Sequence, residues 1–154
     1  MVRFLSLSDF PIFGTRVPGA PYRLRPSAYA LVRNEVGLFA IVRTPLACYL
    51  PGGGMEAGEN PEQTIIREAR EECGFILDAV ALVGRAMEIC YSIEEGEYFE
   101  KDSFFIEATI AGHGPQTELD HELIWMDAAK AREALSHGSH RWAVHRALES
   151  SSSS

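Results

Sequence analysis

The stretch GGMEAGENPEQTIIREAREECGF, residues 53–75, places a glycine-rich segment directly before a helix that carries clustered glutamates. Asn60 and Pro61 form a favourable helix start, with asparagine as the N-cap and proline at the first helical position. Gly74 suits the left-handed residue that commonly ends a helix. The two boundary signals agree, and they predict a helix over residues 61–73.

Three carboxylates share one narrow face of this predicted helix. At 100° per residue, Glu71 and Glu72 lie about 60° and about 40° to either side of Glu68. An apolar stripe beside them is expected to pack on a sheet and consists of Ile65, Ile66, Ala69 and Cys73. Glu72 is therefore expected at the margin of the buried face.

Such crowding of like charges is unfavourable, and more so when the groups are partly buried, unless a cation neutralises them. The ligands on this face are hard oxygens, which favour Mg²⁺ or Mn²⁺ over zinc or copper. A solvated acidic face with local arginine–glutamate pairs is the alternative interpretation, and the helix alone does not decide between the two.

The glycines before the helix decide in favour of the metal site, because the whole stretch resembles the signature of the Nudix hydrolase superfamily. That signature reads Gly, five residues, Glu, seven residues, Arg-Glu, an aliphatic residue, any residue, Glu-Glu, any residue, Gly and an aliphatic residue. All seven fixed positions are occupied at the required spacing, by Gly53, Glu59, Arg67, Glu68, Glu71, Glu72 and Gly74. Ala69 and Phe75 depart from the aliphatic preference but remain apolar. The resemblance implies an α/β fold of the Nudix type, an α/β/α sandwich in which helices flank a mixed β-sheet within a single domain.

The resemblance also implies a divalent metal, Mg²⁺ with Mn²⁺ as an alternative, bound by the loop and helix. Carried over to this sequence, the implied metal ligands are the Gly52 carbonyl oxygen, Glu68, Glu71 and Glu72. Arg67 is expected to hold a box carboxylate, Glu59, in position, and substrate contacts are expected at Gly53, Gly54 and Glu59.

The general base is left open between two kinds of residue. Some family members use a box glutamate, which would be Glu68, and others use an acidic residue on a distant loop. Glu118, Asp120 and Glu122 lie where such a residue often occurs, and Glu118 and Glu122 are the preferred candidates. Whichever is not used is expected to be an ordinary loop acid.

The resemblance implies hydrolysis of a diphosphate linkage in a nucleoside diphosphate derivative. The leading prediction is a MutT-like nucleoside triphosphate pyrophosphohydrolase, which yields a monophosphate and pyrophosphate. Hydrolysis of dinucleoside polyphosphates, nucleotide sugars or the 5′ end of RNA are alternatives, and a non-catalytic nucleotide-binding sensor is an alternative of another class. The box carries out the phosphate chemistry, so it does not distinguish among these substrates.

The composition and net charge of the chain limit its number of domains, its partners and its expected location. The chain has 154 residues, 46% of them hydrophobic and 23% charged, which is typical of one globular domain. A net charge of −8 disfavours nucleic acid as a partner but is compatible with a small nucleotide substrate when a cation lies between them. We see no membrane-spanning apolar run, no signal peptide and no Cys-x-x-Cys pair among the three cysteines, so we expect a cytoplasmic protein with reduced thiols. A homodimer is possible, although no stretch identifies an interface.

Along the chain, residues 1–26 are rich in proline and glycine and are interpreted as an irregular N-terminal arm packed on the domain, with a short strand near residues 4–7. The domain is expected over residues 27–149, followed by a disordered serine tail at 150–154. Strands are predicted at 27–33, 37–43, 48–50, 76–83, 85–92, 98–110 and 123–126, and further helices at 128–135 and 140–149. The first two strands are expected to form a hairpin, and Gly52, Gly53 and Gly54 to break the strand pattern. The histidines at 137, 140 and 145 are assigned to a helix surface.

Overall fold

Helix α1 (Pro61–Cys73) begins and ends where the sequence predicts. The Asn60 side chain accepts a hydrogen bond from the Gln63 N–H, and the Gln63 side chain accepts one from the Asn60 N–H, which completes a capping box. Gly74 ends the helix at φ 70°, and a Cβ there would lie 2.6 Å from the Gly114 carbonyl oxygen. Both backbone conformation and space therefore require glycine at this position.

The computed structural model of the chain describes residues 10–152. The strand predicted near residues 4–7 lies outside this range, as do residues 153 and 154 of the serine tail.

Two sheets carry the strands of the described part of the chain. The strands are β1 (Ile12–Phe13), β2 (Tyr22–Val32), β3 (Phe39–Arg43), β4 (Cys48–Tyr49), β5 (Gly52–Gly54), β6 (Phe75–Ser92), β7 (Glu97–His113) and β8 (Glu122–Met126). The larger sheet has the order β1-β6-β7-β2-β5 and the smaller sheet the order β4-β3-β8. β2 runs parallel to β7, and β1 runs parallel to β6, whereas the other pairs are antiparallel. The sheet is therefore mixed, as predicted.

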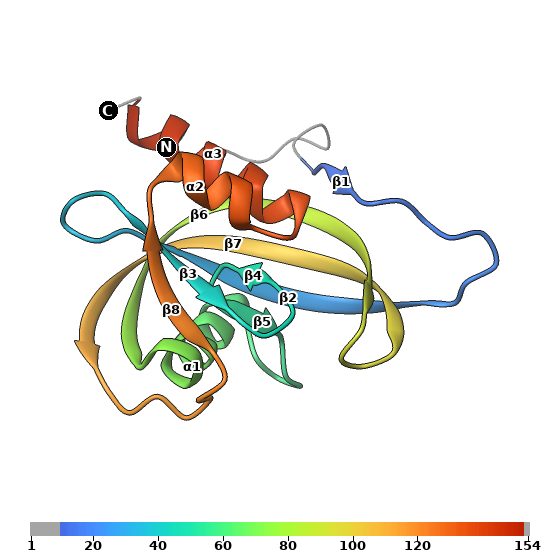
Figure 1. Ribbon diagram of the computed structural model, residues 1–154, viewed down its shortest axis with the longest axis horizontal. Helices are drawn as coiled ribbons and strands as arrows, with labels where there is room; N and C mark the ends of the chain where they lie inside the picture. The colour runs from blue at the N-terminus through green and yellow to red at the C-terminus, as the bar shows by residue number, and fades with distance from the viewer. Residues whose placement is uncertain (1–9, 153–154) are drawn as a thin grey trace.

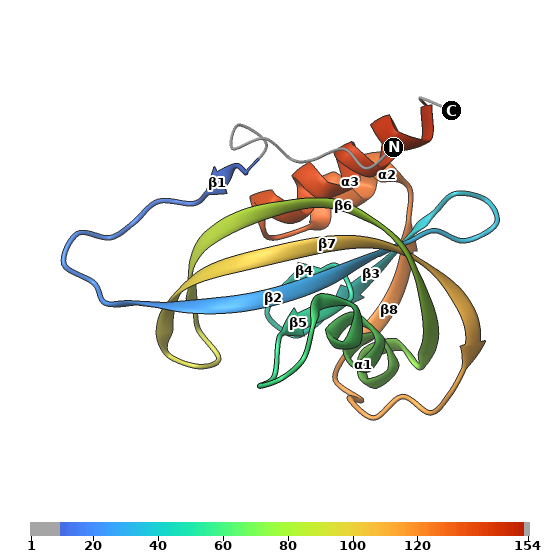
Figure 2. The same ribbon diagram turned by 180° about the vertical axis from the view of Figure 1, so that it is seen from behind.

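Helices cover both faces of the larger sheet (Figures 1 and 2). Helices α2 (Ala128–Ala134) and α3 (Gly138–Ser152) lie on one face, and α1 lies on the other. Successive residues of β2 face opposite layers, because Tyr29 belongs to the core that contains Val144 of α3, whereas Ala30 belongs to the core that contains Ile65 and Ala69 of α1. This arrangement confirms the predicted α/β/α sandwich.

β2 starts at Tyr22, five residues before the predicted strand, so the expected end of the arm at residue 26 falls inside a strand. Pro26 does not interrupt the ladder because its backbone faces away from β7, and its carbonyl accepts a hydrogen bond from the Met55 N–H at 2.8 Å. The segment before β2 contains the short strand β1, which pairs with β6 so that Ile12 lies opposite Met87.

The glycine segment forms strand β5, contrary to the expectation that it would break the strand pattern. β5 pairs antiparallel with β2, with Ala28 opposite Gly53. The missing side chains allow this close approach, since a Cβ on Gly52 would lie 2.2 Å from the Ala28 carbonyl oxygen. The edge strand thereby lies next to helix α1.

The predicted hairpin at residues 27–43 forms only at its turn. The Asn34 N–H donates to the Leu38 carbonyl at 2.9 Å, and Arg33 and Phe39 form one isolated bridge. Beyond this bridge, β2 enters the larger sheet and β3 the smaller one. The residue patterns of two strands that are neighbours in the sequence do not show which strands each of them pairs with.

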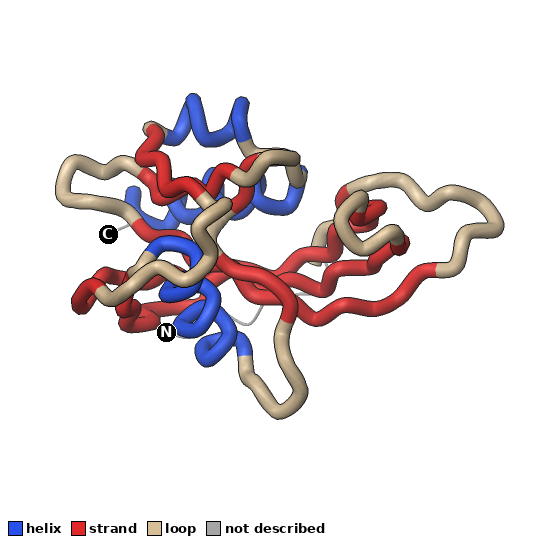
Figure 3. The backbone as a smooth tube through the Cα atoms, turned by 60° about the horizontal axis from the view of Figure 1, so that its bottom comes forward, coloured by secondary structure: helices blue, strands red, loops and turns tan. Residues whose placement is uncertain are grey.

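The strands predicted at 76–83 and 85–92 are one long strand, β6, with register shifts around Ala79–Ala81 and Leu82–Gly84. Figure 3 shows this strand and its neighbours extending past the helices. α3 continues to Ser152, so residues 150–152 are helical where disorder is expected. None of the helices within residues 10–152 is long and apolar enough to cross a membrane.

Candidate active site

Arg67 of α1 organises one side of the site. Its guanidinium donates two hydrogen bonds to Glu59, from Nε at 2.7 Å and from Nη2 at 3.0 Å, and one to the Gly54 carbonyl at 3.1 Å. Nη1 also donates to Glu68 at 3.0 Å and to Glu71 at 3.4 Å. The guanidinium holds the pKa of Glu59 down at about 2, so Glu59 is ionised across the physiological range. The placement of Glu59 beside Arg67 agrees with the expectation from the sequence.

Glu72 lies on the opposite side of the helix face and is 6% exposed. Its Oε1 accepts a hydrogen bond from the Gly52 N–H at 2.8 Å, which joins α1 to β5. Burial raises the pKa of Glu72 well above its ordinary value, and the neighbouring Glu68 raises it further. The helical geometry correctly places Glu72 at the margin of the buried face, although Ile66 of the predicted apolar stripe is 40% exposed.

Glu68 lies between these two regions. Burial raises its pKa to about 7, while Arg67 opposes this shift and Glu71 and Glu118 add to it. A Cβ on Gly53 would lie 2.9 Å from Oε1 of Glu68, so only glycine at this position leaves room for the carboxylate. The glycine segment thus admits the Glu68 side chain.

A loop from the other end of the chain brings Glu118 into the same site. The N–H groups of Thr117 and Glu118 both donate to the carbonyl of Glu71, at 3.1 and 2.9 Å. His121 lies next to this loop, with Nδ1 3.3 Å from Oε2 of Glu118 and Nε2 3.6 Å from Oε2 of Glu72. Burial raises the pKa of Glu118, and Glu71 raises it further, against the opposing effect of His121.

Of the two preferred base candidates, the structure brings only Glu118 to the carboxylates. Glu122 lies on β8, is 60% exposed and pairs with Arg43 at 2.6 Å. Asp120 points to the Nδ1 atom of His121 at 2.9 Å.

The site fits a divalent cation on the chemistry of its donors. Two groups have ligand atoms within 4.8 Å of one another: Glu68 with Glu71 and Glu118, and Glu72 with Glu118 and His121. Nearly all of these atoms are carboxylate oxygens, which suit Mg²⁺ or Mn²⁺. Buried carboxylates with raised pKa values are stabilised in their ionised form by such a cation.

A cavity of about 270 Å³ opens beside these carboxylates and shares Gly52, Gly53 and Glu72 with the site. Its wall also includes Tyr29 of β2 and Lys101 of β7. The cavity gives the site room for the part of a ligand that does not contact the carboxylates.

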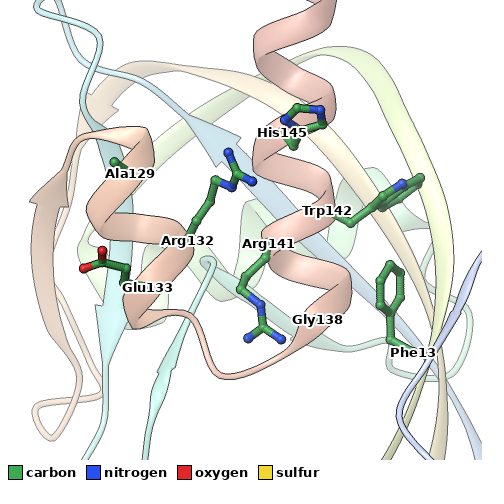
Figure 4. Close-up of a pocket in the computed structure, with 8 residues that line it drawn as sticks. All are labelled: Phe13, Ala129, Arg132, Glu133, Gly138, Arg141, Trp142 and His145. Atoms are coloured by element: carbon green, nitrogen blue, oxygen red, sulfur yellow. The ribbon is translucent and has the colours of Figure 1, made fainter.

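A larger hollow of about 620 Å³ lies between α2 and α3, away from the carboxylates (Figure 4). Arg132 and Arg141 line it, but their guanidinium groups point apart, and Nη1 of Arg141 donates to the Leu135 carbonyl at 2.7 Å. The two cations therefore do not converge on a common ligand.

Comparison with known proteins agrees with this geometry. The sequence model of the NUDIX domain matches residues 23–147. The chain belongs to the NUDIX domain family. This match confirms the family predicted from residues 53–75 and the expected enzyme class, a hydrolase acting on pyrophosphate bonds.

Individual relatives are distant. A Caenorhabditis elegans protein named "Putative nudix hydrolase 1" is 32% identical over 74 residues, which are 48% of this chain and 18% of the length of that relative. A NUDIX hydrolase from Nitrosomonas europaea superimposes with a TM-score of 0.68 at 15% identity, over 83% of this chain and 90% of its own. A MutT protein from Methanosarcina mazei Go1 gives a TM-score of 0.63 at 19% identity, over 81% and 93%. At these identities the two solved structures establish the fold.

Sequence reasoning missed several residues of the NUDIX domain cavity. Tyr29, Lys101 and His137 line it, and they come from β2, β7 and the loop directly before α3. His140, assigned to a helix surface, is buried, and its Nδ1 accepts a hydrogen bond from the Leu50 N–H at 3.2 Å. These residues lie far apart in the sequence, and only the register of the strands shows that they meet.

Proposed function

We propose that this NUDIX domain hydrolyses a diphosphate linkage in a nucleoside diphosphate derivative, with Mg²⁺ as its cofactor. The leading reaction is the conversion of a nucleoside triphosphate to a monophosphate and pyrophosphate. Dinucleoside polyphosphates and nucleotide sugars are alternative substrates of the same chemistry. A small-molecule nucleotide is the expected partner, and nucleic acid is not.

One observation carries this proposal. Glu68 and Glu72 are largely withdrawn from water on one face of α1, and Glu118 joins them from a loop distant in the sequence. Within residues 10–152, Arg67 is the only arginine that pairs with this group, and two of its hydrogen bonds go to Glu59. Charge repulsion of this kind is tolerated when the site binds cations. The net charge of −8 likewise favours a cation between the protein and an anionic substrate.

The residues that would hold the metal are Glu68, Glu71, Glu72 and the Gly52 carbonyl. When bound, the metal supplies a Lewis acid that neutralises phosphate charge and lowers the pKa of a water molecule. Arg67 keeps Glu59 and Glu68 in fixed positions through its hydrogen bonds. Gly53 and Gly54 leave space at the site, since side chains there would meet Glu68 and Arg25.

We assign the general base to Glu118. In the hydrolysis, a water oxygen forms a bond to phosphorus, the bond from phosphorus to the bridging oxygen breaks, and the water proton passes to the Glu118 carboxylate. Its raised pKa makes it a stronger base than an exposed glutamate. Glu122 is engaged by Arg43 and is not assigned this role.

A substrate panel tests the function. Nucleoside triphosphates, dinucleoside polyphosphates and nucleotide sugars are incubated with the protein and Mg²⁺, or with a chelator, and the release of phosphate or pyrophosphate is measured. We expect turnover of at least one class with Mg²⁺ and none with chelator. Tight nucleotide binding without turnover of any class would instead support the non-catalytic sensor.

The cytoplasmic location and the homodimer expected from the sequence remain predictions. Size-exclusion chromatography with light scattering measures the oligomeric state directly.

A further inference from the structure

Lys101 lies on β7 in the wall of the cavity that adjoins the carboxylates. Its register neighbours are Arg25 on β2 and Glu88 on β6. The chain contains one other lysine, Lys130, which is exposed on α2. The cavity therefore holds one of only two lysine side chains in the protein.

The Lys101 ammonium has no hydrogen bond or ion pair within the part of the chain that the structure describes. Its electrostatic interaction with Tyr29 outweighs burial and keeps the pKa of Lys101 above its ordinary value, so the group is charged at neutral pH. A charge that is largely withdrawn from water without a partner is unfavourable. The described part of the protein thus supplies no counter-charge to the Lys101 ammonium.

The nearest charged groups are engaged elsewhere or lie at the surface. Arg25 pairs with Glu95 at 3.0 Å. Glu88 is buried and accepts a hydrogen bond from the Ser139 N–H at 2.9 Å. Glu94, at the rim of the cavity, is exposed to solvent. These contacts leave Lys101 available to a ligand.

Apart from Glu72 at the carboxylate end and Glu94 at the rim, the rest of the wall carries no acidic side chain and includes the polar groups of Tyr29 and His137. Tyr29 lines the cavity together with Glu72 and Lys101 and interacts electrostatically with both. His137 has a buried Nε2 without a hydrogen-bond partner among residues 10–152, and burial lowers the pKa of this histidine to about 3. The cavity consequently places the unpaired Lys101 ammonium together with the uncharged hydrogen-bonding groups of Tyr29 and His137, in the same space that Glu72 lines.

We propose that Lys101 is the specificity-determining residue and binds an anionic oxygen on the group attached to the hydrolysed diphosphate, either a further phosphate or a carboxylate. The proposal rests on the proposed function, because it takes the diphosphate to lie at the carboxylates. An anionic group supplies the counter-charge of Lys101, whereas a neutral sugar leaves it unpaired. The cavity volume of about 270 Å³ suits one small group of this kind.

Two matched substrate pairs test Lys101. UDP-glucose and UDP-glucuronic acid differ by a carboxylate, and GDP and GTP differ by a terminal phosphate. We expect the wild type to prefer the anionic or more highly phosphorylated member of one pair. Lys101→Met should lower kcat/KM for that member by about 10- to 100-fold, the loss of a charge-assisted hydrogen bond, and change the other member less than about threefold. The pair that loses its preference identifies the anion.

Two further variants serve as controls for this comparison. Lys101→Arg should keep most of the preference, because it keeps the charge, and Lys130→Met should behave as wild type, because Lys130 is exposed. Thermal melting checks that Lys101→Met folds. An equal loss of kcat/KM for both members of both pairs would overturn the proposal.

A spectroscopic measurement separates this inference from the proposed function. In Lys130→Arg, Lys101 is the only lysine, so ¹³Cε-lysine labelling gives a single side-chain resonance. If the wild type turns over no class of the wider substrate panel, the proposed function fails, and this resonance then decides the inference. A shift with UDP-glucuronic acid or GTP that exceeds the shift with its partner would support the role of Lys101. No shift with any of the four would overturn it.

Discussion

The two sides of the acidic face of α1 treat their carboxylates in opposite ways. On one side, the Arg67 guanidinium binds Glu59 through two hydrogen bonds, and the pKa of Glu59 falls to about 2. On the other side, Glu72 is buried beside Glu68 and Glu118, and its pKa is raised by burial and by these neighbours. Both sides belong to the same helix and its adjoining loops.

The difference shows which charges the protein balances by itself. On the side of Glu59, the Arg67 guanidinium balances the charge of the carboxylate and holds the neighbouring groups in place. On the side of Glu72, the buried carboxylate accepts a hydrogen bond from the Gly52 N–H and lies 3.6 Å from the His121 imidazole, but no arginine or lysine within residues 10–152 pairs with it, so its ionised form needs a cation from outside. A variant on the Glu72 side should therefore affect chemistry, and a variant on the Arg67 side should affect both position and stability.

The largest effect is expected for Glu72→Gln. The amide keeps the size of the side chain but removes the charge that would bind metal, so kcat should fall by at least about a thousandfold, which corresponds to several kcal/mol of lost metal-assisted stabilisation. Steady-state kinetics with Mg²⁺ measure this loss. In chelator the variant should melt at or above the wild-type temperature, because a buried charge is removed. Glu62→Gln, in the exposed first turn of α1, is the matched control. Wild-type activity of Glu72→Gln would contradict the assignment of the site.

The general base gives the next largest effect. Glu118→Gln should lower kcat by about 10²- to 10⁴-fold, since it removes proton acceptance by a positioned carboxylate. Glu122→Gln should change kcat less than about threefold, because Glu122 is exposed and paired with Arg43. A comparison of kcat for the two variants measures the difference. The reverse order of losses would move the role to Glu122, and small losses in both would move it to Glu68.

The helix and its carboxylates were predictable from the sequence because the interactions that define them are local. Asn60 and Gly74 set the ends of α1, and the helical repeat places Glu68 and Glu72 without knowledge of any other element. The order of strands is not local. Pro26 suggested an irregular arm, yet it lies in β2 because its backbone faces the side away from β7.

The cavity residues show the same limit. Lys101 is one charged residue in a strand of mixed polarity, and nothing near it in the sequence marks it as special. It lines the site because the register of β7 places it on the face shared with Tyr29. In the same way, the sequence does not distinguish Glu118 from Glu122 as the base. The structure does, because the Glu71 carbonyl accepts hydrogen bonds from the backbone of the loop at Glu118.

A smaller effect is expected for Arg67→Met, which tests the side of α1 where Arg67 balances the charge of Glu59. Loss of the guanidinium frees Glu59 and Glu68, so kcat/KM should fall by about 10- to 100-fold, as is usual when a partner that orients metal ligands is removed. The free energy of unfolding should fall by about 1–3 kcal/mol, since Glu59 loses its charged partner. Kinetics and urea denaturation measure the two effects.

The matched control for Arg67→Met is Arg70→Met, because Arg70 is exposed in the last turn of the same helix. It should cost less than about 1 kcal/mol and leave kcat/KM near the wild-type value. If both variants lose the same activity, the hydrogen bonds of Arg67 do not position the site.

The smallest expected effect is the contribution of the carboxylate side to the pH dependence of stability. Glu68 has a folded pKa of about 7, above the value near 4.3 of an unfolded chain, so the folded state retains a proton that the unfolded state releases between these values. Glu68 should therefore lower the stability in chelator as pH rises from about 5 to 7, by roughly a few degrees in Tm, whereas His137 and His140, whose pKa values are lowered by burial, act in the opposite direction. Glu59, with its lowered pKa of about 2, contributes full stability throughout this window and loses it only as pH falls below about 4. Thermal melting at each pH is compared between wild type and Glu68→Gln, which cancels the effect of the histidines: the wild-type Tm minus the variant Tm should decrease with rising pH in chelator, and decrease less with Mg²⁺, which binds the ionised carboxylates. If this difference in Tm is constant or rises across the range in chelator, the carboxylates are balanced by the protein alone, and the contrast between the two sides of α1 is wrong.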